Sequence, residues 1–132
     1  MKIFLDDKRQ PNEVYSTDNW TVVTNYNDFV KLVQDAVIIN LPITVISLDH
    51  DLADEHYEDL FNAVKEQQDL NYENYKEKTG LDCLRFLLYE SDLEIEKTTL
   101  YFHTMNPVGR DNMIKEIEFY TKNKIFNKDL EN

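Results

Sequence analysis

Carboxylates, imidazoles and a hydroxyl follow three short apolar runs of this chain, at the point where each run ends. They are Asp6 and Asp7 after residues 2–5, Asp49, His50 and Asp51 after residues 43–48, and His103 and Thr104 at the end of residues 98–103. Several carboxylates within a few ångströms cannot all stay ionised without a cation between them. Oxygen ligands favour Mg²⁺ or Mn²⁺, while imidazoles shift the preference toward Mn²⁺, Zn²⁺ or iron. The residues therefore predict a metal site, provided that the fold gathers them.

Cations and a helix start lie close to these acids in the sequence. Lys8 and Arg9 follow the first acid pair, and Arg110 follows the last group. Asn106 and Pro107 form a good helix-start signal, and a helix start offers free N–H groups and the positive end of the helix dipole to an anion. Acids for a metal, together with cations and a helix start for an anion, indicate a phosphate site.

Four strands that alternate with helices must position these residues. We expect strands over residues 2–5, 20–24, 43–48 and 98–103. Alternation of strands and helices predicts an α/β fold with a parallel sheet and right-handed crossovers. The strand order 2-1-3-4 places the first and third strands side by side. The carboxyl ends of strands one, three and four then share one edge, where open α/β sheets bind ligands.

Helices are expected between and after the strands. Asn27 or Asp28 can cap a helix that runs to about Ile38, and Thr79 can cap another over the following leucines. The last helix runs from Asn106 to about residue 122, with an inner stripe of Met113, Ile114, Ile117 and Tyr120. The tail from residue 123 is expected to fray, although Ile125 and Phe126 are candidates to pack against the body.

The length of 132 residues fits a single domain over residues 1–132. A polar segment at about 53–79 is inserted in this domain. Tyr57, Leu60, Phe61 and Val64 recur at helical spacing and predict one amphipathic helix there. Residues 66–78 then form a long connector of the kind that often serves as a lid or a binding element.

Composition narrows the range of partners. Lys and Arg number 14 against 26 Asp and Glu, which gives a net charge of −12. This charge repels a nucleic-acid backbone, so we expect no face that binds duplex nucleic acid. The single Cys83 excludes an internal disulfide and fits a reducing compartment. No signal peptide or membrane span is visible, so we expect a cytoplasmic protein, either cellular or encoded by an invader of cells.

The acid pair after the first strand, Asp49-x-x-Leu52 after the third and Thr104 after the fourth resemble the receiver domains of response regulators. The resemblance implies a three-layer, receiver/flavodoxin-like fold. It also implies that Asp6 and Asp7 bind Mg²⁺, that Asp49 accepts phosphate and that the Thr104 hydroxyl contacts the phosphoryl group. The chain departs from receivers because it lacks a fifth strand and the lysine at its end, and its first helix is shortened or lost. We therefore expect a truncated receiver.

A closer resemblance is to the cyclic-phosphate processing receiver-like family. Four blocks in order carry it: Leu5-Asp6-Asp7-Lys8-Arg9-Gln10-Pro11, Ser47-Leu48-Asp49-His50-Asp51-Leu52, Thr79-Gly80 and His103-Thr104-Met105-Asn106-Pro107-Val108-Gly109. The resemblance implies action on cyclic phosphates, in RNA repair or in nucleotide signalling. Such small proteins also occur in large bacteriophages, and the Asn- and Lys-rich composition of this chain suits one.

We therefore expect a metal-dependent phosphohydrolase or phosphodiesterase. Its substrate would be a cyclic or terminal phosphate on a nucleotide or an RNA end. The expected metal ligands for Mg²⁺ or Mn²⁺ are Asp6, Asp7 and Asp49, with Asp51 or His50 completing the set. His50 and His103 are the expected proton donor and acceptor, and Arg9, Thr104, Asn106 and Arg110 are expected to hold the phosphate. Whether Asp49 is also a nucleophile, or water attacks directly, stays open.

A binding protein without catalytic activity is the competing hypothesis. A degenerate receiver could dock to a partner, or a phage factor could sequester or block a host protein. The acidic surface and the segment around Tyr72 and Tyr75 would then be the working surface. The two histidines beside the carboxylates distinguish the hypotheses, because docking alone does not need them.

Overall fold

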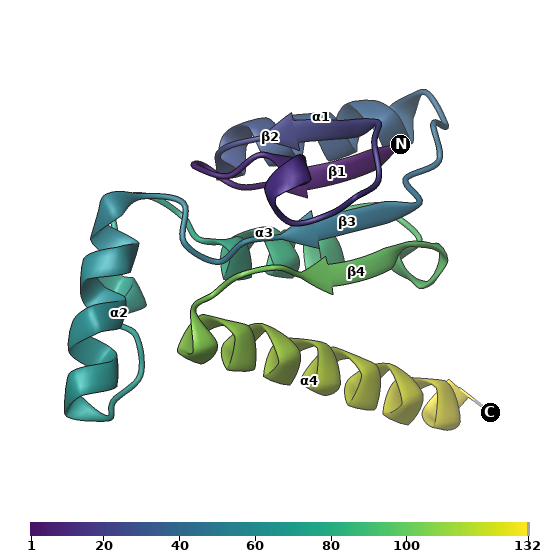
Figure 1. Ribbon diagram of the computed structural model, residues 1–132. Helices are drawn as coiled ribbons and strands as arrows, with labels where there is room; N and C mark the ends of the chain where they lie inside the picture. The colour runs from purple at the N-terminus through teal and green to yellow at the C-terminus, as the bar shows by residue number, and fades with distance from the viewer. Residues whose placement is uncertain (132) are drawn as a thin grey trace.

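The computed structural model describes residues 1–131, and the side chains of residues 1–124. Its centre is a parallel sheet of four strands in the order β2-β1-β3-β4 (Figure 1). The strands are β1 Lys2–Leu5, β2 Trp20–Val23, β3 Val45–Leu48 and β4 Thr99–Phe102. The predicted fold class, strand order and truncated receiver architecture are confirmed.

The central strand β1 is apolar on both faces of the sheet. Ile3 and Leu5 join the main hydrophobic core, whereas Phe4 points to the opposite face, and all three are fully buried. Such continuous burial is typical of a parallel strand that has neighbours on both sides. The apolar run Lys2–Leu5 therefore specifies the position of β1 inside the sheet as well as its strand conformation.

Four α-helices connect or follow the strands: α1 Tyr26–Ile38, α2 Asp54–Glu66, α3 Gly80–Arg85 and α4 Pro107–Glu131. Single turns lie at η1 Pro11–Glu13, η2 Tyr72–Asn74, η3 Phe86–Glu90 and η4 Ile95–Lys97. Among residues 1–131, no helix has both the length and the apolar composition needed to cross a membrane.

The helix starts follow local capping chemistry, with one difference from the prediction. Asn25 caps α1 by accepting a hydrogen bond from the Asp28 N–H at 2.9 Å, so the predicted caps Asn27 and Asp28 are wrong. Thr79 caps α3, as predicted, in a capping box with Asp82. The Asn106 side chain accepts the Gly109 N–H at 2.8 Å at the start of α4.

Helix α4 extends beyond its predicted end near residue 122, because its backbone stays helical to Glu131. Met113 is fully buried and Ile117 packs against the core, as the predicted stripe required. Ile114 is 36% exposed, so it does not belong to the inner face. The predicted packing of Ile125 and Phe126 concerns side chains outside those described.

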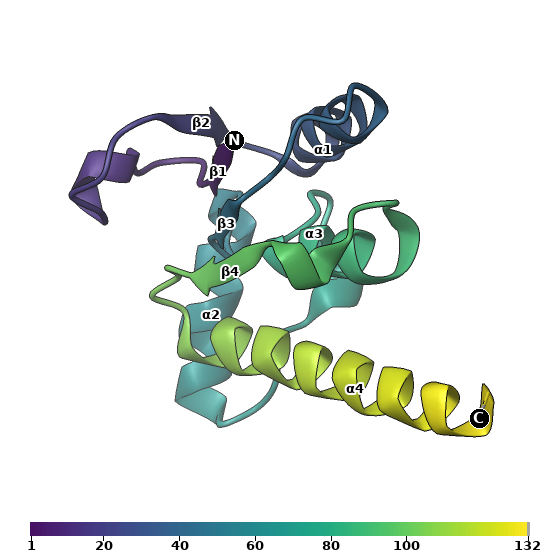
Figure 2. The same cartoon turned by 90° about the vertical axis from the view of Figure 1, so that its right-hand side faces the viewer.

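The two faces of the sheet are covered differently. Helices α1 and α3 lie on one side, and the loop that contains η1 lies on the other (Figure 2). On this second side, Tyr15 from the loop stacks on Trp20 with ring centroids 5.1 Å apart and meets Phe4 edge-on at 6.3 Å. An aromatic loop therefore forms the third layer of the predicted three, in the place of a helix.

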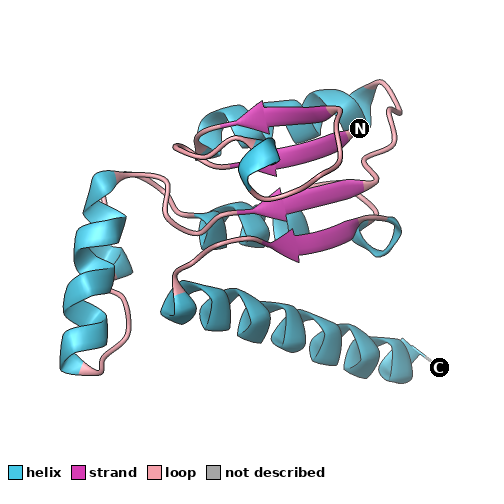
Figure 3. Cartoon of the chain, viewed as in Figure 1, coloured by secondary structure: helices cyan, strands magenta, loops and turns pink. Residues whose placement is uncertain are grey.

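Helix α2 stands beyond the carboxyl ends of the strands, and the loops that leave β1, β3 and β4 gather at the same edge (Figure 3). Its predicted apolar stripe is only partly buried, since Phe61 is 72% and Val64 is 54% exposed. The buried His56 anchors the helix instead. Its Nδ1 accepts the Leu52 N–H, and its Nε2–H donates to the Glu77 carbonyl, both at 2.9 Å. Polar contacts therefore hold this helix to the body.

Candidate functional site

Three adjacent strands each deliver one functional side chain at the same level of the sheet. Leu5, Leu48 and Phe102 are paired in register, so the next residues along the three strands are Asp6, Asp49 and His103. These three side chains are buried, and each offers one ligand atom within 4.8 Å of the others. Because the strands are parallel and unshifted, the register itself assembles the cluster.

Asp6 is surrounded by hydrogen-bond donors. Its Oδ1 accepts the N–H groups of Lys8 and Arg9 at 2.9 Å, and its Oδ2 accepts Arg9 Nε at 3.0 Å. His103 Nε2 lies 3.1 Å from the same Oδ2. Burial alone would raise the pKa of Asp6, but these donors outweigh burial and lower the pKa to about 2. An ionised carboxylate only accepts hydrogen bonds, so Nε2 of His103 carries a proton in this arrangement.

Asp49 has the opposite shift. Burial first, and then the charge of Asp6, raise the pKa of Asp49 to about 7, although the Thr104 hydroxyl, the His50 N–H and Arg9 oppose the rise. Arg9 Nη2 lies 3.8 Å from Asp49 Oδ1 and neutralises only part of the charge. Near neutral pH, Asp49 therefore retains a proton for much of the time. A divalent cation between the two carboxylates would replace that proton.

His103 is held by a chain of hydrogen bonds that the sequence did not predict. Its Nδ1 lies 2.7 Å from Ser47 Oγ, which in turn lies 2.7 Å from the Tyr15 hydroxyl. The imidazole also stacks on Phe4, with ring centroids 4.3 Å apart and ring planes 9° from parallel. These contacts fix the ring so that Nε2 faces Asp6. The one available signal was a hydroxyl at position 47 inside an otherwise apolar buried strand.

A cleft of about 280 Å³ opens beside the cluster. Its lining residues come from the segments that follow β1, β3 and β4 and from α2: Lys8, Arg9, Asp49, Asp51, Tyr57, Leu60, Thr104, Met105 and Asn106. Thr104 is buried and its hydroxyl oxygen accepts the Asn106 N–H at 3.1 Å. The predicted phosphate-binding residues Arg9, Thr104 and Asn106 thus lie together on the wall of one cleft.

His50 and Asp51 form a second polar group beneath the start of α4. His50 Nδ1 lies 2.7 Å from Asp51 Oδ1, and His50 Nε2 lies 2.7 Å from the Tyr72 hydroxyl. Asn106 Nδ2 donates to Asp51 Oδ1 at 2.9 Å. His50 is fully buried, and a Cβ placed on Gly109 would lie only 2.4 Å from its Cγ. This group ties the loop after β3 to η2 and α4, and both nitrogens of His50 are engaged.

Two other predicted residues lie apart from the cluster of Asp6, Asp49 and His103. Asp7 accepts a hydrogen bond from the Tyr57 hydroxyl at 3.2 Å and so faces α2. Arg110 is exposed on α4 and is not among the residues that line the cleft. The group within reach of one ion therefore differs from the predicted ligands, since it contains His103 and lacks Asp7 and Asp51. The predicted roles of these residues stay predictions.

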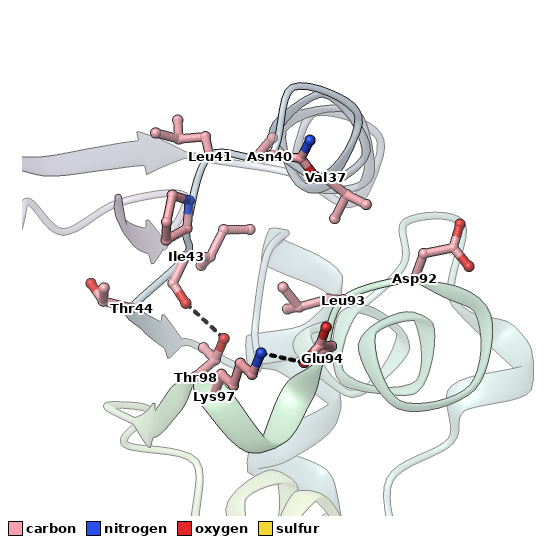
Figure 4. Close-up of a pocket in the computed structure, with 12 residues that line it drawn as sticks. Val37, Asn40, Leu41, Ile43, Thr44, Asp92, Leu93, Glu94, Lys97 and Thr98 are labelled. Atoms are coloured by element: carbon pink, nitrogen blue, oxygen red, sulfur yellow. Dashed lines mark hydrogen bonds and ion pairs between the residues drawn. The ribbon is translucent and has the colours of Figure 1, made fainter.

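The opposite edge of the sheet carries a second cavity, of about 320 Å³, between the end of α1 and η4 (Figure 4). Some of its polar groups pair with one another. Lys97 Nζ pairs with Glu94 Oε2 at 2.7 Å, and the Thr98 hydroxyl donates to the Ile43 carbonyl at 2.7 Å. Its lining contains none of the acids and imidazoles that follow the strands, so the carboxyl edge is the better candidate.

Comparison with known proteins shows the family of the chain. The family model described as the cyclic-phosphate processing receiver domain matches residues 1–119, which include the whole cluster and all lining residues of the cleft. No curated protein and no solved structure matches the chain. Because the match spans most of the 132 residues, the chain belongs to the cyclic-phosphate processing receiver family.

Proposed function

We propose that this protein is a metal-dependent phosphohydrolase that opens a cyclic phosphate, or removes a terminal phosphate, on a nucleotide or an RNA end. The observation that carries the proposal is the buried cluster of Asp6, Asp49 and His103, whose ligand atoms lie within 4.8 Å of one another. This cluster adjoins a cleft that contains Lys8 and Arg9. Membership of a phosphate-processing family supports the same substrate chemistry.

The donor set fits a divalent cation. Two carboxylates and one imidazole suit Mn²⁺ well and also accept Mg²⁺. When bound, such a cation polarises phosphoryl oxygens and lowers the pKa of water. To serve as a ligand, His103 must move its proton from Nε2 to Nδ1. Ser47 Oγ, 2.7 Å from Nδ1, can accept as well as donate, so it supports the ring in either form.

The phosphate would lie against Arg9 and Thr104. Arg9 is held in place because its Nε donates to Asp6 at 3.0 Å and its Nη2 donates to the His103 carbonyl at 3.1 Å. A guanidinium fixed in this way stabilises charge that develops on phosphoryl oxygens without first having to reorganise. Both nitrogens of His50 are engaged, so we assign His50 to positioning the loop after β3 rather than to proton transfer.

Two routes use the same residues. In one, an Asp49 oxygen forms a bond to phosphorus while the bond to the leaving oxygen breaks, and water then cleaves the phosphoaspartate. In the other, water attacks phosphorus directly. In the first route the leaving oxygen takes up a proton from solvent, and the water that cleaves the phosphoaspartate releases one. In the second, the attacking water gives up the proton that the leaving oxygen gains. Trapping with beryllofluoride or detection of an acyl phosphate supports the first route, whereas direct entry of ¹⁸O from water without an adduct supports the second.

The deciding experiment is a panel of 2′,3′-cyclic, 3′,5′-cyclic and 1″,2″-cyclic phosphates with several divalent metals, followed by phosphorus NMR. We expect Asp49→Asn and His103→Ala each to abolish turnover while circular dichroism shows a folded protein. Asp35→Asn is the matched control, because Asp35 is exposed on α1 and pairs only with Lys31 among the described contacts. Equal activity in the site variants would contradict the proposal. Absence of binding to millimolar Mg²⁺ or Mn²⁺ would favour the competing hypothesis of a binding protein.

A further inference from the structure

The cleft beside the cluster has a polar end and an apolar side. Arg9, Asp49 and Thr104 form the polar end. Tyr57 and Leu60 from α2 and Met105 from the loop before α4 form the apolar side. A phosphate group needs only the polar end. The apolar side is therefore suited to contact a second chemical group of the ligand, attached to the phosphate.

The apolar side is assembled from residues that are held in place. Tyr57 and Leu60 are three residues apart, so they lie on one face of α2. The Tyr57 hydroxyl donates to Asp7 at 3.2 Å, which fixes the ring at the wall of the cleft. Met105 is 82% exposed although it borders a buried polar cluster. A flat apolar group in the cleft would remove surface of all three side chains from water, which favours binding.

Charge limits how many phosphates the cleft accepts. Lys8 and Arg9 are the two cations among its lining residues. The bordering helix α2, Asp54–Glu66, contains five acidic residues and one lysine. This surface would repel further phosphates along a nucleic-acid strand. The charges therefore fit a ligand that carries one phosphate.

Size points to the same conclusion. The volume of about 280 Å³ lies just below the range of ~300–1,000 Å³ typical of small-molecule sites, so the cleft has room for a small ligand. We infer that the cleft binds a phosphate carried on a single nucleoside, whose base lies against Tyr57, Leu60 and Met105, and that these three residues select base-bearing over base-free sugar phosphates. This inference rests on the proposed function and narrows its substrate class.

The test compares adenosine 2′,3′-cyclic phosphate with ribose 2,3-cyclic phosphate, which has no base. Contact between a base and an aromatic side chain is worth enough to change affinity about fivefold or more. We expect the wild-type protein to have at least about a fivefold higher kcat/KM for the adenosine compound. Met105→Ser and Leu60→Ala should each lower kcat/KM for the adenosine compound and reduce this preference at least about twofold, because the adenosine compound alone carries a base for these side chains to contact.

Phe61→Ala is the matched control for Leu60→Ala. Phe61 follows Leu60 on α2, is 72% exposed and does not line the cleft, so its truncation should preserve the preference. Met105→Ser removes a side chain that is 82% exposed, so a change in folding is not expected there. Equal kcat/KM for the two wild-type reactions, or loss of the preference in Phe61→Ala, would overturn the inference. An RNA oligonucleotide with a 2′,3′-cyclic end that reacts ten times faster than the adenosine compound would also overturn it.

Failure of the proposed catalytic function can be distinguished from failure of the inferred nucleoside binding. If no phosphate is turned over, the cleft is tested by calorimetric titration with adenosine 2′-monophosphate and ribose 5-phosphate. Tighter binding of the adenosine compound that Met105→Ser abolishes would support the inference without catalysis. Equal binding of both compounds would overturn it.

Discussion

Replacing Asp49 by Asn should stabilise the metal-free protein at alkaline pH. Asp49 is buried next to the ionised Asp6, and its pKa is raised to about 7 from an ordinary value of 3.8. A protein that contains an acid with a higher pKa in the folded state than in the unfolded state loses stability as the pH rises from the unfolded value to the folded one. Ionisation of Asp49 should therefore lower the free energy of unfolding of the wild-type protein as the pH rises from about 4 to about 8. Asn carries no charge and avoids this loss.

The size of the effect follows from the same shift. A pKa difference of one is worth ~1.4 kcal/mol, so the rise from 3.8 to about 7 corresponds to at most about 5 kcal/mol. Asn loses the strong hydrogen bond between the carboxylate and Thr104. Its Oδ1 can still accept the His50 N–H, which lies 2.8 Å from Asp49 Oδ1 in the wild-type protein. We expect a net gain in the free energy of unfolding of about 2 kcal/mol at pH 8 and little gain at pH 5.

Urea unfolding in EDTA at pH 5 and pH 8 measures this gain, with Trp20 fluorescence as the signal. Asp6→Asn is the contrasting variant, because hydrogen bonds lower the pKa of Asp6 to about 2. Asp6 therefore stabilises the fold at pH values above 3.8, and this contribution is lost as the pH falls through about 2, so Asp6→Asn should destabilise the protein at pH 8. If Asp49→Asn is no more stable than wild type at pH 8, the electrostatic account of the cluster is wrong.

Two further variants test the residues that hold His103 and His50 in position. Ser47→Ala leaves the Tyr15 hydroxyl and His103 Nδ1 without their 2.7 Å partner. It should cost about 1–3 kcal/mol of stability and weaken Mn²⁺ binding ~10–100-fold by calorimetric titration; unchanged Mn²⁺ affinity would exclude an orienting role. Gly109→Ala should destabilise the protein by about 1–3 kcal/mol in thermal unfolding, because its Cβ would lie 2.4 Å from His50 Cγ. Ala normally stabilises a helix relative to Gly, so a higher melting temperature would contradict the close packing described here.

The strand ends could be predicted from sequence because apolar runs and the residues that follow them are local features. Asp6 and Asp49 were identified in this way as neighbours across β1 and β3. Ser47 and Tyr15 could not be, since their contact depends on the path of the loop around η1 over the second face of the sheet. Hydroxyl groups in the sequence carry no indication of such a distant partner.

The two histidines illustrate a second limit of prediction from the sequence. Both His50 and His103 follow strands, and in the sequence it is His50 that stands between two acids, Asp49 and Asp51. Only His103 is the first residue after its strand, at the level of Asp6 and Asp49, whereas His50 lies one residue further and turns beneath α4. Helical spacing likewise predicted α2 but not its buried face, because His56 anchors the helix through polar contacts.

Because β1, β3 and β4 pair without a shift, the number of residues in each strand determines whether Asp6, Asp49 and His103 meet. Inserting one residue into β3 would carry Asp49 to the opposite side of the sheet, because neighbouring side chains in a strand alternate between the faces. The same insertion in the exposed residues 67–69, directly after α2, would lengthen a surface turn and leave the register of the strands unchanged. Changes in chain length should therefore be tolerated around the insertion that carries α2 and rejected within the strands, even where every ligand residue is kept.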